Sequence, residues 1–68
     1  MLSPAHLVDC EVQHRGNVRE GPGTNFDVAF AVDAGNALTG YSYLDDWVRV
    51  SDDSGRSGWI FRSLVTRR

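Results

Sequence analysis

The 68-residue chain contains no lysine, a single cysteine and no long hydrophobic run. All seven basic residues are arginine, and the net charge of −2 argues against a nucleic-acid-binding face. The single cysteine, Cys10, excludes an intrachain disulfide and leaves the redox compartment open. Because no apolar run reaches about 18 residues, we expect no membrane-spanning segment.

The first residues also lack the basic start and the apolar stretch of a signal peptide. Two locations stay open. The chain is either cytoplasmic or a domain of a larger exported protein, which would place it in the cell envelope, the periplasm or outside the cell. Its length allows one small domain, which we expect to be a monomeric part of a larger chain.

Apolar and polar residues alternate in short segments, the pattern of half-buried β-strands. It predicts strands over residues 8–12, 28–32, 38–43, 47–50 and 58–61, with shorter extended segments at 17–19 and 65–66. Residues 62–64 are enough for only one 3₁₀ turn, and no segment shows a sustained helical period. We therefore predict an all-β fold, a small five-stranded barrel over residues 8–66, between a flexible tail at 1–7 and a second tail at 67–68.

The segment Gly21-Pro22-Gly23 marks a sharply defined loop, because glycine reaches positive φ and proline fixes φ near −65°. It lacks the lysine and the following helix of a phosphate-binding loop. Two roles stay open for it: setting turn geometry alone, or stiffening a loop beside a binding groove.

Groups able to carry catalysis or bind a metal are few. Four carboxylates fall in two turns: Asp45, Asp46, Asp52 and Asp53. We interpret them as turn residues that bond nearby backbone N–H groups, with a paired acid–base or metal site as the alternative. Cys10, with His6 and His14, offers too few ligands for a metal, and we expect it to be a small buried hydrophobe. We predict no catalytic residue, no metal site and no cofactor.

Aromatic side chains are the strongest functional signal, and there are seven: Phe26, Phe30, Tyr41, Tyr43, Trp47, Trp59 and Phe61. Clustered on the surface of a barrel, they would form a shallow groove suited to a peptide or a sugar. Alternation places Tyr41 and Tyr43 on one face of their strand. Trp47 and Trp59 either face outward or belong partly to the core.

Three spaced motifs resemble the bacterial SH3 family: Asn17-Val18-Arg19-Glu20-Gly21-Pro22-Gly23-Thr24-Asn25-Phe26, then Asp46-Trp47-Val48-Arg49-Val50, then Gly55-Arg56-Ser57-Gly58-Trp59-Ile60. The resemblance spans about Val8 to Val65 and implies an SH3-like barrel. It also implies a non-catalytic binding module, often attached to cell-wall enzymes or envelope proteins, that binds peptidoglycan peptides.

By the same resemblance, the ligand site lies between the Gly21–Phe26 loop and the Trp47 region. Its candidate residues are Asn25, Phe26, Tyr41, Tyr43, Trp47 and Arg49. The aromatic rings would stack on the peptide or glycan, and Arg49 would pair with a carboxylate of the stem peptide.

Eukaryotic SH3 domains bind proline-rich helices, and their last motif aligns with residues 58–65. Phe61 replaces the groove proline and Leu64 replaces the groove tyrosine, so we reject a proline-rich ligand. The alternative to a wall ligand is a docking domain that binds a partner protein or another part of its own chain.

Phe30 and Gly40 depart from the pattern of the bacterial family. Phe30 stands where the family often has a small residue, and Gly40 where it often has valine or isoleucine. We hypothesise that the ring of Phe30 fills the space that Gly40 leaves.

Overall fold

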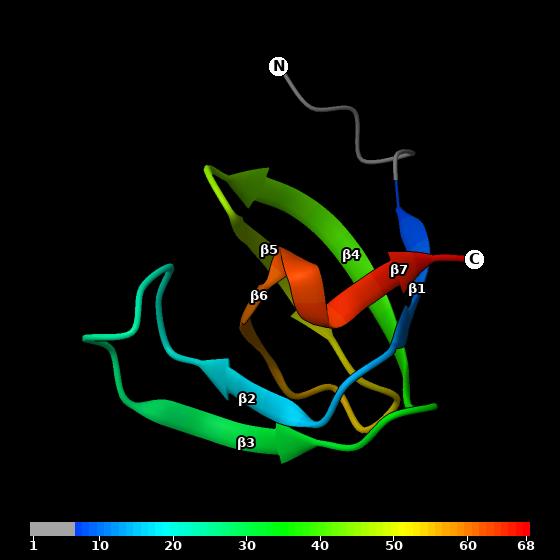
Figure 1. Cartoon of the computed structure of the whole chain (residues 1–68), viewed down its shortest axis with the longest axis horizontal. Helices are drawn as coiled ribbons and strands as arrows, with labels where there is room; N and C mark the ends of the chain where they lie inside the picture. Colours follow the sequence, from blue (N-terminus) through cyan, green and yellow to red (C-terminus); the bar gives the residue numbers. More distant parts are fainter. Residues whose placement is uncertain (1–6) are drawn as a thin grey trace.

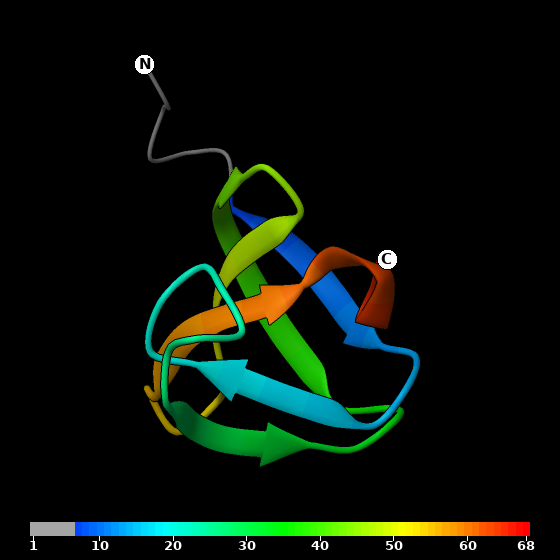
Figure 2. The same cartoon turned by 60° about the vertical axis from the view of Figure 1, so that its left-hand side comes forward.

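The computed structural model describes residues 7–68. Their short strands form one antiparallel sheet. The strands are β1 (Val8–Val12), β2 (Gly16–Arg19), β3 (Val28–Val32), β4 (Ala37–Leu44), β5 (Trp47–Ser51), β6 (Ser57–Phe61) and β7 (Val65–Arg67). Their spatial order is β3-β2-β6-β5-β4-β1-β7, and one 3₁₀ turn, η1 (Arg62–Leu64), precedes β7. The sheet curls on itself into a small barrel (Figures 1 and 2). The predicted all-β, SH3-like fold and its 3₁₀ turn are confirmed.

Seven strands replace the five predicted, because both of the shorter extended segments also pair with neighbours. β2 pairs with β3 and β6, and β7 pairs with β1. Arg67 lies opposite Cys10, and the N–H of Arg68 donates to the carbonyl of Asp9 at 2.9 Å, so these two residues do not form the expected tail. Of the expected N-terminal tail, residues 1–6 lie outside the described residues. No helix within residues 7–68 is long and apolar enough to cross a membrane.

The core lies inside the curled sheet and is built from the inward positions of six strands. Its members are Cys10, Val12, Val18, Phe30, Val32, Leu38, Val50 and Ile60. Four of them, Val12, Val18, Val50 and Ile60, are almost completely excluded from solvent. Fully burying a side chain of this size stabilises a fold by about 1.5–3 kcal/mol. The burial of Cys10 confirms its expected role as a small hydrophobe.

Two irregularities in strand pairing move side chains to the face opposite the one that simple alternation predicts. On β4, Gly40 pairs with Val50 while Ser42 pairs with Arg49, so Tyr41 is an extra residue and Tyr43 comes to lie opposite Val48. On β3, Phe30 pairs with Val18 while Val28 pairs with Arg19. A bulge inserts one residue into a strand, and a shift of one residue exchanges the two faces.

The consequence for β3 is that Val28 leaves the core face and is 46% exposed. For β4, Tyr43 leaves the face that carries Trp47 and Arg49. The expectation that Tyr41 and Tyr43 share one face of a regular strand is therefore wrong.

The proposed exchange of volume between Phe30 and Gly40 is also wrong. A Cβ atom at Gly40 would lie 3.3 Å from Cys10 Sγ and 3.6 Å from Val48 Cγ1, its nearest side-chain neighbours. The guanidinium carbon of Arg56 lies 4.3 Å from the centroid of the Phe30 ring. Phe30 is thus covered by Arg56, while Cys10 and Val48 border the space at Gly40.

Candidate functional site

The outward side chains of β2, β6 and β5 form one continuous surface, which we call the outer face. Trp59 on β6 lies directly opposite Arg19 on β2 and Arg49 on β5. Because neighbouring strands are about 4.8 Å apart, the backbones of the two arginines are about 10 Å apart, with Trp59 between them. Two residues further along, Trp47 on β5 lies opposite Phe61 on β6.

An aromatic pair occupies one end of the outer face. The rings of Trp47 and Phe61 meet edge to face, with centroids 5.4 Å apart and planes inclined by 74°. They border a hollow of about 390 Å³, the aromatic hollow, lined by Gly16, Asn17, Arg19, Thr24, Trp47, Phe61 and Leu64. Phe61 is 39% exposed, so this hollow offers apolar surface to a ligand.

Hydroxyl groups occupy the other end of the outer face. A second hollow of about 380 Å³, the hydroxyl hollow, is lined by Tyr41, Arg49, Ser51, Gly55 and Ser57. The hydroxyls of Tyr41 and Ser51 are hydrogen-bonded to each other. Since one of them donates and the other accepts, the accepting group keeps its own proton for a further partner.

The loop between β2 and β3 is held by Arg19. Its Nη1 donates to the carbonyls of Thr24 at 3.2 Å and Phe26 at 2.9 Å. The Glu20 N–H donates to the Asp27 carbonyl at 2.8 Å and closes the base of the loop. These bonds fix Thr24 beside the aromatic hollow, so one wall of that hollow is preorganised.

Gly21, the first glycine of this loop, is explained by the close approach of the Phe26 ring and not by a positive φ. Gly21 is buried, and a Cβ there would lie 2.5 Å from the ring of Phe26. Neither Gly21 nor Gly23 has a positive φ, in contrast to the sequence-based expectation. Phe26 therefore packs back onto its own loop and stays 42% exposed.

Positive charge on the outer face is not neutralised by carboxylates on the same face. The outward residues of the three strands are Asn17, Arg19, Trp47, Arg49, Ser51, Ser57, Trp59 and Phe61, without an aspartate or glutamate. The ion pairs within the described residues join Arg15 to Asp33, Arg56 to Asp52 and Arg62 to Asp46. Arg49 takes part in none of these three pairs.

The six predicted site residues do not meet in one groove. Trp47, Arg49 and Tyr41 border the outer face. Asn25 and Phe26 lie in the adjoining loop, but Thr24 is the residue that lines the aromatic hollow there. The bulge at Tyr41 moves Tyr43 to the opposite face, where its side chain is 79% exposed.

Tyr43 contributes instead to an apolar hollow of about 340 Å³ near the start of β1. This apolar hollow is lined by Val8, Cys10, Gly40, Tyr41, Ser42, Tyr43 and Val48. Burial, the largest cause, raises the pKa of the Cys10 thiol, while a hydrogen bond from the Gly40 backbone acts in the opposite direction. Cys10 is therefore a poor nucleophile at neutral pH.

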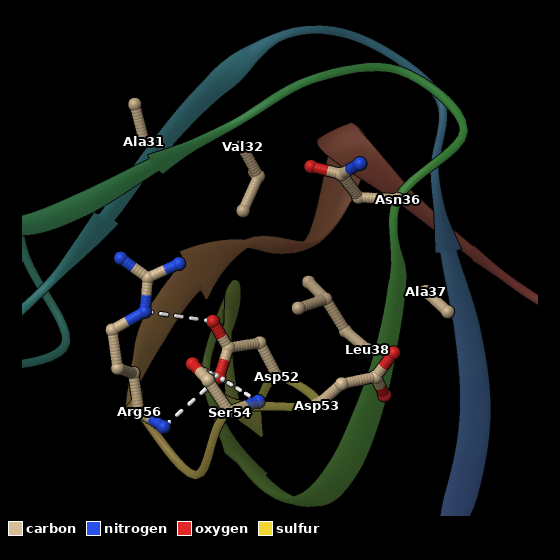
Figure 3. A pocket seen from close by; sticks show the side chains of 9 residues that line it. All are labelled: Ala31, Val32, Asn36, Ala37, Leu38, Asp52, Asp53, Ser54 and Arg56. Carbon is tan, nitrogen blue, oxygen red and sulfur yellow. Dashed lines mark hydrogen bonds and ion pairs between the residues drawn. The ribbon is translucent and has the colours of Figure 1, made fainter.

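A fourth hollow, of about 280 Å³, lies beside the turn that joins β5 and β6 (Figure 3). Asp52 organises this turn: its Oδ1 accepts from the Ser54 and Arg56 backbone N–H groups at 3.1 and 2.9 Å, and its Oδ2 accepts from Arg56 Nε at 2.8 Å. Partial burial alone would raise the pKa of Asp52, but the hydrogen bonds from Ser54 and Arg56 and the charge of Arg56 together lower it. The role expected for this carboxylate, bonding the backbone of its own turn, is confirmed.

The other predicted turn carboxylates are also placed in turns. Asp45 adopts φ 55° in the two-residue connection between β4 and β5, and Asp46 pairs with Arg62 at 3.3 Å. Within residues 7–68, no group of three or more histidine, cysteine, aspartate or glutamate side chains could hold a metal ion.

Arg19, Trp59 and Phe61 belong to the outer face but not to the predicted site. Alternation did place Trp59 and Phe61 on one side of their strand, opposite the buried Ile60. Their position beside Trp47 and Arg49 follows from the pairing of β5 with β6, which local sequence does not specify.

Comparison with known proteins agrees with this geometry. The family profile described as "Bacterial SH3 domain" matches residues 14–66. The chain therefore belongs to the bacterial SH3 domain family. It is 33% identical over 51 residues to "Putative N-acetylmuramoyl-L-alanine amidase YrvJ" of Bacillus subtilis (strain 168), an alignment that covers 75% of this chain and 10% of that protein. The chain thus spans about a tenth of the length of this relative. No solved structure matches the chain.

Proposed function

We propose that this domain is a non-catalytic binding module that attaches a larger protein to peptidoglycan peptides of the cell wall. The observation that carries the proposal is the outer face, where two arginines flank Trp59 beside the Trp47–Phe61 pair. Family membership supports a binding role, and the relative named as an amidase supports a wall ligand.

The shape of the outer face suits an extended, flexible ligand. Aromatic rings supply large contact areas at small entropic cost, and arginines supply planar arrays of N–H donors. A short peptide could lie along β5 and β6, from the aromatic hollow to the hydroxyl hollow. Trp47, Arg49 and Tyr41 keep their proposed ligand-binding roles, and Arg19, Trp59 and Phe61 join them.

Co-sedimentation with purified peptidoglycan sacculi tests this function, with cellulose as a control polymer. We expect the wild-type domain to sediment with sacculi only. Trp47→Leu should weaken this binding at least fivefold, because it removes one ring of the aromatic pair. Tyr43→Leu is the matched control: it removes an exposed ring from the opposite face and should bind like the wild type. Equal loss in both variants, or equal binding to cellulose, would contradict the proposal.

A specific observation also favours the second function, docking onto a partner protein. Tyr43 is 79% exposed near the end of β4, where it lines the apolar hollow. Exposed apolar groups beside such a hollow are typical of a protein interface. If sacculi are not bound while Tyr43→Leu prevents assembly with a partner, docking is the function.

A further inference from the structure

We propose that the hydroxyl hollow is a carboxylate subsite, which takes a free carboxylate of a peptide whose apolar part lies on Trp47 and Phe61. The two ends of the outer face differ in chemistry, so a bound ligand has a defined direction. This inference rests on the proposed function for the identity of the peptide, but the chemistry of the hollow stands by itself.

The hydroxyl hollow presents a set of donors that suits a carboxylate. Arg49 is exposed and presents a guanidinium whose parallel N–H groups match the two oxygens of a carboxylate. Ser57 and the Tyr41–Ser51 hydroxyl pair line the same hollow. One proton of that pair is engaged between the two oxygens, so the second hydroxyl proton remains for a ligand oxygen.

The charge of the outer face favours an anionic ligand. The chain carries a net charge of −2, yet the outward positions of β2, β6 and β5 carry two arginines and no carboxylate. Asp46 and Asp52, the acids that directly flank β5, are paired with Arg62 and Arg56. A ligand carboxylate would therefore meet uncompensated positive charge at Arg49, and electrostatic complementarity of this kind favours specific binding.

The order of the side chains along β5 gives a bound ligand its direction. Arg49 lies next to Trp47 on the same face of β5, and Ser51 lies two residues further along. The order along the strand is therefore aromatic ring, guanidinium, hydroxyl. Arg19, the second arginine of the row, already donates through Nη1 to the loop carbonyls, whereas Arg49 has no such partner among the described residues. Arg49 is thus the better carboxylate donor of the two.

The test is a two-dimensional NMR titration of the 68-residue domain that follows the Arg49 Nε–Hε signal. Two peptide probes are used: a soluble muropeptide with free stem-peptide carboxylates, and trialanine, which is not a wall fragment. Each probe is compared with its carboxylate-amidated form. We expect the free acid of each to shift the Arg49 signal, and amidation to weaken binding at least tenfold.

Arg49→Gln should weaken binding of the free muropeptide at least tenfold and leave the amidated form unchanged. Arg49→Lys keeps the charge but loses the paired donors, so its binding should be intermediate. Arg15→Gln is the control, because it removes an exposed arginine that pairs with Asp33.

The outcomes distinguish the carboxylate subsite from the wall-binding function. If muropeptide binding is unchanged by amidation and by Arg49→Gln, the carboxylate subsite is overturned and the wall-binding function stays in place. A carboxylate-dependent shift with trialanine and none with the muropeptide supports the subsite and contradicts the wall ligand. No shift at Arg49 with either free acid overturns the subsite.

Discussion

Trp47 and Phe61 lie opposite each other on β5 and β6, with their rings edge to face and their centroids 5.4 Å apart. The pair has a structural role and a proposed binding role in this part of the sheet. It covers the outer side of the strands whose inner side carries Val50 and Ile60, and it forms the apolar end of the proposed binding face.

The aromatic pair should contribute measurably to stability. In a double-mutant cycle of Trp47→Leu and Phe61→Leu, we expect a coupling energy of about 0.5–1.5 kcal/mol, the usual value for an edge-to-face aromatic pair. Urea unfolding of the four proteins measures it. Additive effects, with a coupling near zero, would show that the two rings do not stabilise each other.

Gly40 should resist enlargement because of Cys10. A Cβ at Gly40 would approach Cys10 Sγ to 3.3 Å, and valine adds two methyl groups beyond it. We expect Gly40→Val to lower the free energy of unfolding by about 1–3 kcal/mol, the usual cost of overpacking. Cys10→Ala removes the sulfur and should recover part of that loss in the double variant.

Phe30→Leu is the control for this prediction, since the structure places Phe30 under Arg56 and not beside Gly40. If Phe30→Leu rescues Gly40→Val as well as Cys10→Ala does, the assignment of the neighbour at Gly40 is wrong.

Much of this fold could be predicted from the sequence, because alternation, turn residues and the short 62–64 segment are local signals. The inward positions of Val12, Val50 and Ile60 follow from period-2 alternation alone. The family motifs independently indicated the same barrel. Local signals were also enough to predict that Asp52 would anchor a turn and that Cys10 would be buried.

The site was predicted less completely, because it depends on pairing between strands. The extra residue at Tyr41 is invisible to local periodicity, since only the partner strand β5 shows that Ser42 and not Tyr41 faces Arg49. One such residue moves Tyr43 to the opposite face. A separate shift in the pairing of β3 with β2 likewise moves Val28 out of the predicted core face.

The turn organised by Asp52 should make stability depend on pH. The folded pKa of Asp52 is lowered, so its contribution is present above the unfolded pKa, about 3.9, and is lost as the pH falls through the folded pKa. Asp52→Asn should lower Tm at pH 7 and reduce the loss of Tm between pH 5 and pH 2. Thermal unfolding followed by circular dichroism at each pH measures both effects.

Asp53→Asn is the control for Asp52, because it removes a carboxylate from the same turn and keeps the hydrogen bonds of Asp52 to Ser54 and Arg56. A pH profile of Asp52→Asn that runs parallel to that of the wild type would contradict the role of this carboxylate.

Cys10 should be protected from alkylation in the folded domain. The residue is 6% exposed, and burial raises the pKa of its thiol, so both access and thiolate fraction are reduced at pH 8. We expect iodoacetamide to react at least tenfold more slowly with the native domain than with the domain in 8 M urea. Mass spectrometry follows the reaction, and equal rates in both states would contradict the burial of Cys10.

The outer face is the proposed binding surface, and both tryptophans of the chain, Trp47 and Trp59, lie on it. The most direct test is to follow the indole N–H signals of Trp47 and Trp59 by NMR while a soluble muropeptide is added, with the ring signals of Tyr43 as an internal reference. We predict that both indole signals shift saturably with one common Kd while the Tyr43 signals stay in place. Stationary indole signals together with a saturable shift at Tyr43 would contradict binding at the outer face and assign it to the opposite face.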